Sequence, residues 1–136
     1  MDRRTFLQWT AKGCAAGCAS VLLPACASVP TLRPKVDGDV LSVSGDQLLD
    51  SDDAWYVARA GGPLVLLRQG AGFVALSGVC THLECRLRPS GTFLRCPCHG
   101  STFQPDGTVV RGPATRALPT YAVRETAAGL EIVVPK

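Results

Sequence analysis

The bunching of cysteine with histidine near the middle of the chain constrains this sequence more than any other feature. The chain has 136 residues and seven cysteines, and four of these lie between residues 80 and 98. Of the two histidines of the sequence, His82 lies within this segment and His99 directly follows it. Cysteine and histidine together are the side chains that transition metals select, and so many cysteines exceed what ordinary packing requires. The fold therefore has to bring short cysteine-bearing and histidine-bearing segments to one place.

Size and charge exclude several classes of protein. A chain of 14.3 kDa has room for one domain and one modest core, which excludes a large multidomain enzyme. The net charge is only +3, and Arg3, Arg4 and Lys12 all lie within the first twelve positions. The remainder is close to neutral, which argues against a nucleic-acid binder, because such a protein normally has a clustered basic surface.

Residues 1–27 are predicted to be an export signal. Arg3 and Arg4 precede an apolar run of small residues, 13–29, and this arrangement resembles a twin-arginine signal. The run is interrupted by Pro24 and is marginal for crossing roughly 30 Å of hydrocarbon, so a stable membrane span is disfavoured. An amphipathic first helix is the alternative, but the run has no polar face.

Two processing patterns overlap at the end of this signal. Residues 23–26 resemble a lipoprotein cleavage box, which would make Cys26 the lipid-carrying first residue and discard Cys14 and Cys18. Residues 25–27 also fit ordinary signal cleavage, which would start the mature protein at Ser28 without lipid. We favour lipidation of Cys26, and in either case we expect the protein on the periplasmic side of the bacterial inner membrane.

The remainder of the chain is predicted to be an all-β domain. Residues 28–35 contain two prolines and are expected to form a linker outside the core, followed by a domain over 36–136. No helical periodicity occurs after residue 36, and short apolar runs bounded by turn-forming residues occur instead. These runs are 40–43, 55–57, 64–67, 73–76, 92–94, 121–123 and 130–134. Residues 69–72 and 126–129 are predicted to be hairpin connections between antiparallel strands.

Two segments carry the chemistry of the chain. The first, 80–85, reads C-T-H-L-E-C, and the second, 96–103, reads C-P-C-H-G-S-T-F. Each offers a cysteine and a histidine at short spacing, so that together they can supply two thiolates and two imidazoles to one centre. A structural zinc site in a small interaction module is the alternative, since these residue types suit tetrahedral Zn²⁺, but it leaves two cysteines unexplained.

The two segments, C-T-H-L-x-C followed by C-P-C-H-G-S, resemble the Rieske iron-sulfur proteins, in particular those of quinol-oxidising cytochrome complexes. The resemblance implies an antiparallel β-sandwich with a small cluster-binding subdomain made of two loops. It implies that Cys80 and Cys96 bind one iron of a [2Fe-2S] cluster. It assigns the other iron to His82 and His99.

The resemblance also implies roles for the residues around these ligands. It pairs Cys85 with Cys98 in a disulfide that joins the two loops, and a reducing cytosol would disfavour this bond, whereas export permits it. Ser101 matches a serine whose hydroxyl bonds a bridging sulfide of the cluster. Gly112 and Pro113 lie in a segment that resembles the proline loop covering the cluster.

Two positions depart from the family pattern. Phe103 stands where high-potential members carry a tyrosine that bonds a cysteine sulfur, so one hydrogen-bond donor is missing. Glu84 replaces a family glycine, which puts the conformation of the first loop in question and adds an acid near the cluster. Both changes are expected to lower the reduction potential relative to those members.

The mixed ligand set has a direct electrostatic consequence. Two thiolates bring the charge of a diferric cluster core to zero, whereas four would leave it negative, so an electron is added more easily. Such clusters have potentials of about −150 to +300 mV, against roughly −400 mV for all-cysteine plant-type clusters. Reduction leaves negative charge beside the imidazoles and raises the pKa of a ligand histidine, so that electron uptake can carry a proton.

We therefore expect an exported one-electron carrier or redox subunit rather than a stand-alone enzyme. Its partner would be a cytochrome, a quinol-oxidising complex of the cytochrome bc type or a molybdenum enzyme resembling arsenite oxidase, and the sequence leaves subunit and free carrier both open. Five arginines near the two loops outnumber the acids there, and scattered solvated side chains are the simpler interpretation than a docking surface. They are Arg86, Arg88, Arg95, Arg111 and Arg116.

Overall fold

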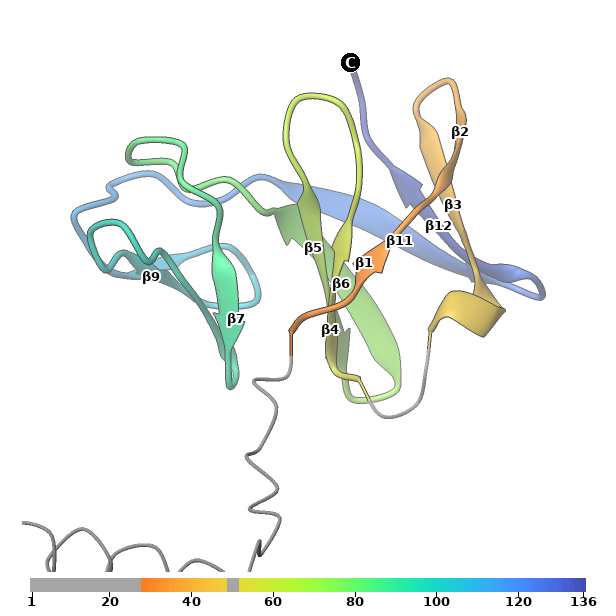
Figure 1. The fold of residues 1–136 in the computed structure, drawn as a ribbon, viewed down its shortest axis with the longest axis horizontal. Coiled ribbons are helices and arrows are strands. Elements are labelled where there is room, and N and C mark those ends of the chain that lie inside the picture. Colours follow the sequence, from red (N-terminus) through yellow and green to blue (C-terminus); the bar gives the residue numbers. More distant parts are fainter. Residues whose placement is uncertain (1–27, 49–51) are drawn as a thin grey trace, which may run out of the picture.

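The computed structural model of the chain describes residues 28–48 and 52–136 (Figure 1). The larger of its two sheets has the strand order β1-β4-β5-β6-β11-β12-β3-β2, and every pairing is antiparallel except that of β1 with β4. These strands are β1 Thr31–Leu32, β2 Lys35–Asp37, β3 Val40–Ser44, β4 Ala54–Val57, β5 Leu64–Gln69, β6 Gly72–Ser77, β11 Thr120–Thr126 and β12 Gly129–Val133, with a short 3-10 helix at Gly45–Gln47.

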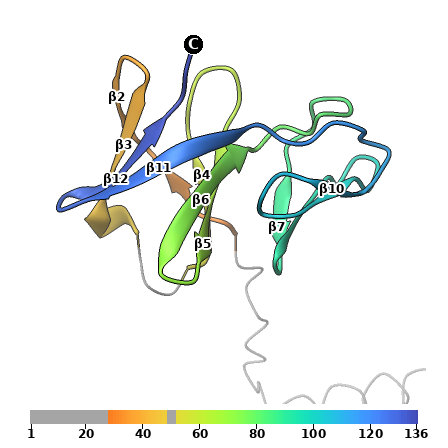
Figure 2. The ribbon, with the colours of Figure 1, turned by 180° about the vertical axis from the view of Figure 1, so that it is seen from behind.

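The smaller sheet has the strand order β10-β9-β8-β7, and all its pairings are antiparallel. Its strands are β7 Arg88–Ser90, β8 Phe93–Arg95, β9 Thr102–Phe103 and β10 Val109–Arg111. Figure 2 shows this sheet beside the curled larger sheet, so the prediction of an all-β, antiparallel sandwich is confirmed. The small subdomain is more than the two predicted loops, because the four short strands hold those loops.

Strand β5 is covered on both faces, which explains its uninterrupted apolar sequence. Leu64 and Leu66 contribute to the core enclosed by the curled larger sheet, whereas Val65 and Leu67 pack in a second core under the small sheet. Since neighbouring side chains of a strand point to opposite faces, an all-apolar run fits a strand with no solvent-facing side. The larger sheet is thus the layer on which the small subdomain rests.

The two predicted hairpins are confirmed. Gln69 pairs with Gly72 and Thr126 pairs with Gly129, which leaves two-residue turns between the strands. Gly70 has φ +57°, a left-handed conformation that glycine adopts without steric cost. At Gly129 a Cβ atom would overlap the backbone carbonyl of Val43, so this position has no room for a side chain.

The small subdomain is an insertion between two neighbouring strands of the larger sheet. The chain leaves β6, forms β7 to β10, and returns as β11, whose Thr120 pairs with Leu76 of β6 (Figure 1). The buried Tyr56 hydroxyl donates a 2.8 Å hydrogen bond to the carbonyl of Leu87, and the Arg86 guanidinium lies 3.8 Å above the Tyr56 ring. The entry and exit of the insertion are therefore held together by the larger sheet.

The prediction that residues 28–35 lie outside the core is wrong at Thr31–Leu32. These residues pair in parallel with β4, and Leu32 is buried. The prolines at 30 and 34 flank the strand rather than interrupt it, which is compatible with an edge position. The sequence does not predict strands β7, β9 and β10. Each of them is only two or three residues long and contains arginine or threonine, so it has no alternating apolar pattern.

The predicted export signal over residues 1–27 and the predicted lipidation site Cys26 lie outside the described residues. In the part of the chain that the structure describes, no helix has the length and apolar character needed to cross a membrane.

Candidate metal centre

The first loop, residues 80–85, is a tight turn closed by two backbone hydrogen bonds. The N–H of Cys80 donates to the carbonyl of Cys85 at 2.8 Å, and the N–H of Glu84 donates to the carbonyl of Cys80 at 3.0 Å. An antiparallel bridge between Val79 and Arg86 closes the base of the loop. Hydrogen bonds within the turn thus fix the backbone of a segment that has no regular secondary structure.

The second loop, residues 96–101, repeats this arrangement. The N–H of Cys96 donates to the carbonyl of Ser101 at 2.7 Å, and the N–H of Gly100 donates to the carbonyl of Cys96 at 3.0 Å. The fifth residue of each loop is left-handed, with φ +61° at Glu84 and +85° at Gly100. The first loop therefore has the conformation of the second although it lacks the glycine, which answers the question raised by Glu84 in the sequence.

The two reduced cysteines lie side by side inside the molecule. Cys80 and Cys96 are the free cysteines of the described residues, and both are buried in the core under the small sheet. Burial raises the pKa of the Cys80 thiol, and the adjacent Cys96 thiol raises it further, whereas hydrogen bonds from the His82 N–H and the Ser101 hydroxyl lower it. The two sulfurs therefore form a buried pair, and the hydrogen-bond donors are directed at the sulfur of Cys80.

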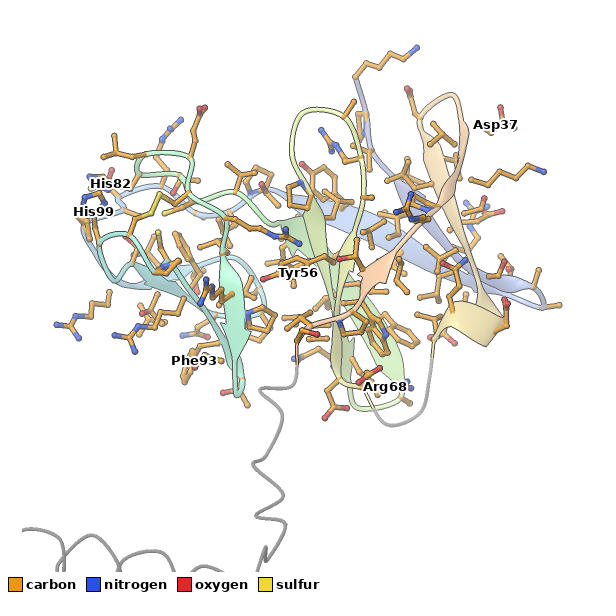
Figure 3. The ribbon with its side chains drawn as sticks, viewed as in Figure 1. Asp37, Tyr56, Arg68, His82, Phe93 and His99 are labelled. Atoms are coloured by element: carbon orange, nitrogen blue, oxygen red, sulfur yellow. A yellow bond between two sulfur atoms is a disulfide. The ribbon has the colours of Figure 1, made fainter. Side chains whose placement is uncertain are left out.

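The two histidines form the outer half of the same site. The ring centroids of His82 and His99 are 5.0 Å apart and the rings are perpendicular, at the tip of the small subdomain (Figure 3). His82 is half-buried and His99 is exposed. The Nδ1 atom of His82 is buried without a hydrogen-bond partner, and such an orphaned ring nitrogen is what a metal ligand needs.

Cys85 and Cys98 form the expected disulfide between the loops, with Cα atoms 6.5 Å apart. The sulfur atoms of Cys85, Cys96 and Cys98 lie within 4.8 Å of one another. Because two of these three sulfurs are bonded to each other, only Cys96 of this group can act as a thiolate ligand. The disulfide thus borders the site without belonging to its ligand set.

A segment between β10 and β11 ties the two loops together from the side. The N–H of Ala114 donates a 3.0 Å hydrogen bond to the buried Ser101 hydroxyl, and the Thr81 hydroxyl donates a 2.7 Å hydrogen bond to the carbonyl of Arg116. Gly112 and Pro113, predicted to cover the site, precede these contacts and are exposed. Sequence reasoning missed Thr81, because its role depends on a backbone carbonyl distant in the chain.

The structure thus brings together all four predicted ligands and the predicted tuning residues Ser101 and Phe103. Phe103 is fully buried in the same core as the two free thiols. Two buried thiols and two imidazoles nearer the surface form a mixed donor set whose chemistry fits two metal ions of one cluster, sulfur on one and nitrogen on the other. The same donor types are also ligands of a single Zn²⁺ ion, so the donor set alone does not separate these chemistries.

Comparison with known proteins separates them. The family model described as Rieske [2Fe-2S] domain matches residues 40–122. The menaquinol:cytochrome c reductase iron-sulfur subunit of Bacillus subtilis is 32% identical over 133 residues, which cover 82% of this chain and 78% of that protein. The carotenoid phi-ring synthase of Chlorobaculum tepidum is 37% identical over 92 residues, which cover 65% of this chain and 14% of that protein.

Among solved structures, the chain is similar to the cyanobacterial plasma membrane Rieske protein PetC3 from Synechocystis PCC 6803. The TM-score is 0.57 at 27% sequence identity, and the match covers 68% of this chain and 95% of that chain. The chain spans 14% to 37% of the length of the first four curated relatives that it matches.

The left-handed backbone of Glu84 generates a prediction. The substitution Glu84→Gly should raise the thermal unfolding midpoint by about 4 °C, since an L side chain in this conformation costs roughly 1 kcal/mol. Calorimetry of the cluster-loaded protein measures the midpoint. The matched control Glu125→Gly, at an exposed position of β11, should lower it instead, because glycine weakens a strand. An equal fall of the unfolding midpoint in both variants would contradict a strained, left-handed backbone at Glu84.

Proposed function

Because this chain belongs to the Rieske [2Fe-2S] domain family, we propose that it transfers one electron at a time between protein partners of a membrane-associated oxidoreductase. The observation that carries the proposal is the convergence of a buried thiol pair and an outward imidazole pair on two matching loops.

The ligand assignment follows from the positions of the four side chains. We assign Cys80 and Cys96 to the inner iron and His82 and His99 to the outer iron of the cluster. When bound, the cluster supplies one-electron chemistry at a potential above that of all-cysteine clusters. His82 would bind through Nδ1, a buried ring nitrogen that has no hydrogen-bond partner among the described residues.

The surrounding residues hold the site rigid and dry on its inner side. The Ser101 hydroxyl accepts a hydrogen bond from the N–H of Ala114, so its own proton remains available to a sulfur atom. Ser101 is fully buried, and its donor direction is therefore set by the protein rather than by solvent. A donor directed at sulfur stabilises the reduced state and raises the potential.

The histidine side is where we propose that electrons enter and leave. His99 is exposed at the tip of the small subdomain, whereas the sulfur side is buried. A partner that approaches the tip therefore meets an imidazole first.

The partner we propose is a quinol-oxidising complex of the cytochrome bc type. The similarity to the iron-sulfur subunit of a menaquinol:cytochrome c reductase supports this choice, because it extends over most of both chains. The alternative form of this proposal is a free carrier that serves a cytochrome or a molybdenum enzyme. It would use the same site without being a permanent subunit of a complex.

We assign the protein to the periplasmic side of the inner membrane. Arg3 and Arg4 ahead of the apolar run, and the lipoprotein-like residues 23–26, support export by the twin-arginine route and lipidation of Cys26. The disulfide between Cys85 and Cys98 also supports an oxidising compartment.

The ligand assignment predicts the behaviour of two variants. His99→Ala should lose most of its bound iron and the electron paramagnetic resonance signal of the reduced cluster, because the outer iron loses one of its two imidazoles. Leu83→Ala, an exposed neighbour of His82, is the control and should keep both. Iron analysis and spectra of anaerobically isolated protein measure the outcome. A colourless wild-type protein loaded with zinc would overturn the proposed function.

The missing tyrosine predicts a change in potential. Phe103→Tyr should raise the midpoint potential, since the buried ring lies in the core with both free thiols and a hydroxyl there can donate to sulfur. A hydrogen bond about 1 kcal/mol stronger to the reduced form shifts a one-electron potential by roughly 40 mV. Phe93→Tyr on the exposed face serves as the control in a redox titration, and an unchanged or lower potential for Phe103→Tyr would refute the idea.

The export assignment predicts where the protein accumulates. Replacing Arg3 and Arg4 together by lysine should leave the protein in the cytoplasm, whereas the control Lys12→Arg should not alter its location. Cell fractionation measures the location, and mass spectrometry of the exported form identifies its first residue. A mature protein that begins at Ser28 without lipid would exclude the role of Cys26.

A further inference from the structure

Strand register places three arginines in a single row across the small sheet. Arg88 of β7 pairs directly with Arg95 of β8. Arg95 pairs with Thr102 of β9, and Thr102 pairs with Arg111 of β10. We call these three side chains the arginine row. Neighbouring strands are about 4.8 Å apart, so the row spans roughly 15 Å across all four strands.

The arginine row faces solvent. The residues next to it along the strands, Leu94 and Phe103, pair with each other and are fully buried. Because successive side chains alternate between the faces of a sheet, Arg88 and Arg95 lie on the opposite, outer face. The register of β10 shifts between Val109 and Arg111, so the place of Arg111 in the row rests on its pairing with Thr102 and on its exposure. Arg88, Arg95 and Arg111 are all exposed.

No acid of the described residues neutralises the row. The ion pairs there join Arg68 to Asp53 and Arg124 to Glu131, and neither pair lies in the small sheet. Asp106, between β9 and β10, is engaged instead by the N–H and hydroxyl of Thr108 at 2.9 and 2.7 Å, and these bonds lower the pKa of Asp106.

An unneutralised row of this kind costs stability. Like charges directly opposite each other on paired strands are destabilising, and Arg88 and Arg95 are such a pair. Arginines that were only scattered over the surface would have no reason to lie directly opposite each other on paired strands. The cost is offset when an acidic surface binds to the row, because each guanidinium can then bind a carboxylate through two hydrogen bonds.

The arginine row continues into an open groove of about 630 Å³ that leads to the cluster site. Arg88 and Arg95 line one end of the groove, and the second loop, with the exposed His99, lines the other. Phe93 is 42% exposed beside Arg95 on the outer face, at the end of the sheet away from the histidines (Figure 3). Arginine and an exposed aromatic ring together are enriched at protein interfaces.

We propose that the outer face of the small sheet is the docking surface for an acidic face of an electron-transfer protein, with partner carboxylates on the arginine row and the partner's redox centre near His99. This inference rests on the proposed function. It replaces the interpretation of these arginines as scattered solvated side chains. The occupant is an acidic protein rather than an anionic lipid surface, because the groove connects the row to the exposed imidazole of His99.

The test uses two redox probes of opposite surface charge. One is a basic cytochrome c, and the other is the same cytochrome with its lysines succinylated, which makes its surface acidic. The protein variant carries Arg88→Gln, Arg95→Gln and Arg111→Gln. The matched control carries Arg33→Gln, Lys35→Gln and Arg124→Gln, which removes the same charge from exposed positions in the larger sheet or next to it.

Stopped-flow oxidation of the reduced protein and equilibrium binding of the oxidised protein to each oxidised cytochrome are measured at low and high salt. The row variant should react with the acidic cytochrome about tenfold more slowly than wild type at low salt and bind it correspondingly more weakly. The difference should largely disappear at high salt. The control variant should lose no more than about twofold with either probe, because its charges lie away from the site.

Three results would overturn the docking surface. They are equal losses in the row and control variants, an unchanged rate for the row variant, and binding of wild type but not the row variant to phosphatidylglycerol vesicles with no effect on the acidic cytochrome. The failure of the proposed function looks different, since the wild-type protein would then hold no reducible cluster. Unchanged optical spectra and midpoint potential in the row variant show that its cluster is intact.

Discussion

Two irregular loops must be held face to face for this site to exist, and the bond between Cys85 and Cys98 is the covalent part of that constraint. Closing a loop of about 14 residues contributes roughly 3 kcal/mol in the chain-entropy view. Hydrogen bonds do the rest, because each loop carries the same two backbone bonds and the segment after β10 bridges both loops. The larger sheet supplies the foundation, since the subdomain leaves and re-enters it at neighbouring strands.

In this construction the inner and outer ends of the site differ in their exposure to water. The thiol pair is buried in a core shared with the larger sheet, whereas the imidazole pair reaches the surface at the tip. The thiols are therefore shielded from water, whereas the exposed His99 is not, so a redox partner reaches the histidine side of the site first. The arginine row lies next to the histidine side, so positive charge is placed beside the exposed end of the site.

Much of the fold was accessible from the sequence, and the part that was not has a common cause. Apolar runs such as 64–67 and 73–76 predicted strands that are present, and the turn at 69–72 connects them as expected. Strands β7, β9 and β10 were missed because their formation depends on neighbours in the small sheet rather than on their own residues. Thr31–Leu32 was missed for the same reason, since it is a strand only by virtue of pairing with β4.

The order and spacing of cysteine and histidine in 80–85 and 96–101 resemble one family pattern, and that resemblance predicted the four ligands of the site. It also predicted the disulfide between Cys85 and Cys98, which is present. The sequence alone could not determine how these ligands are surrounded. The hydrogen bond from Ala114 to Ser101 exists only once the segment after β10 packs against the second loop. The alignment of Arg88, Arg95 and Arg111 exists only once the strands of the small sheet pair. Local chemistry is written in neighbouring residues, whereas burial, backbone contacts and cross-strand register are set by segments far apart in the chain.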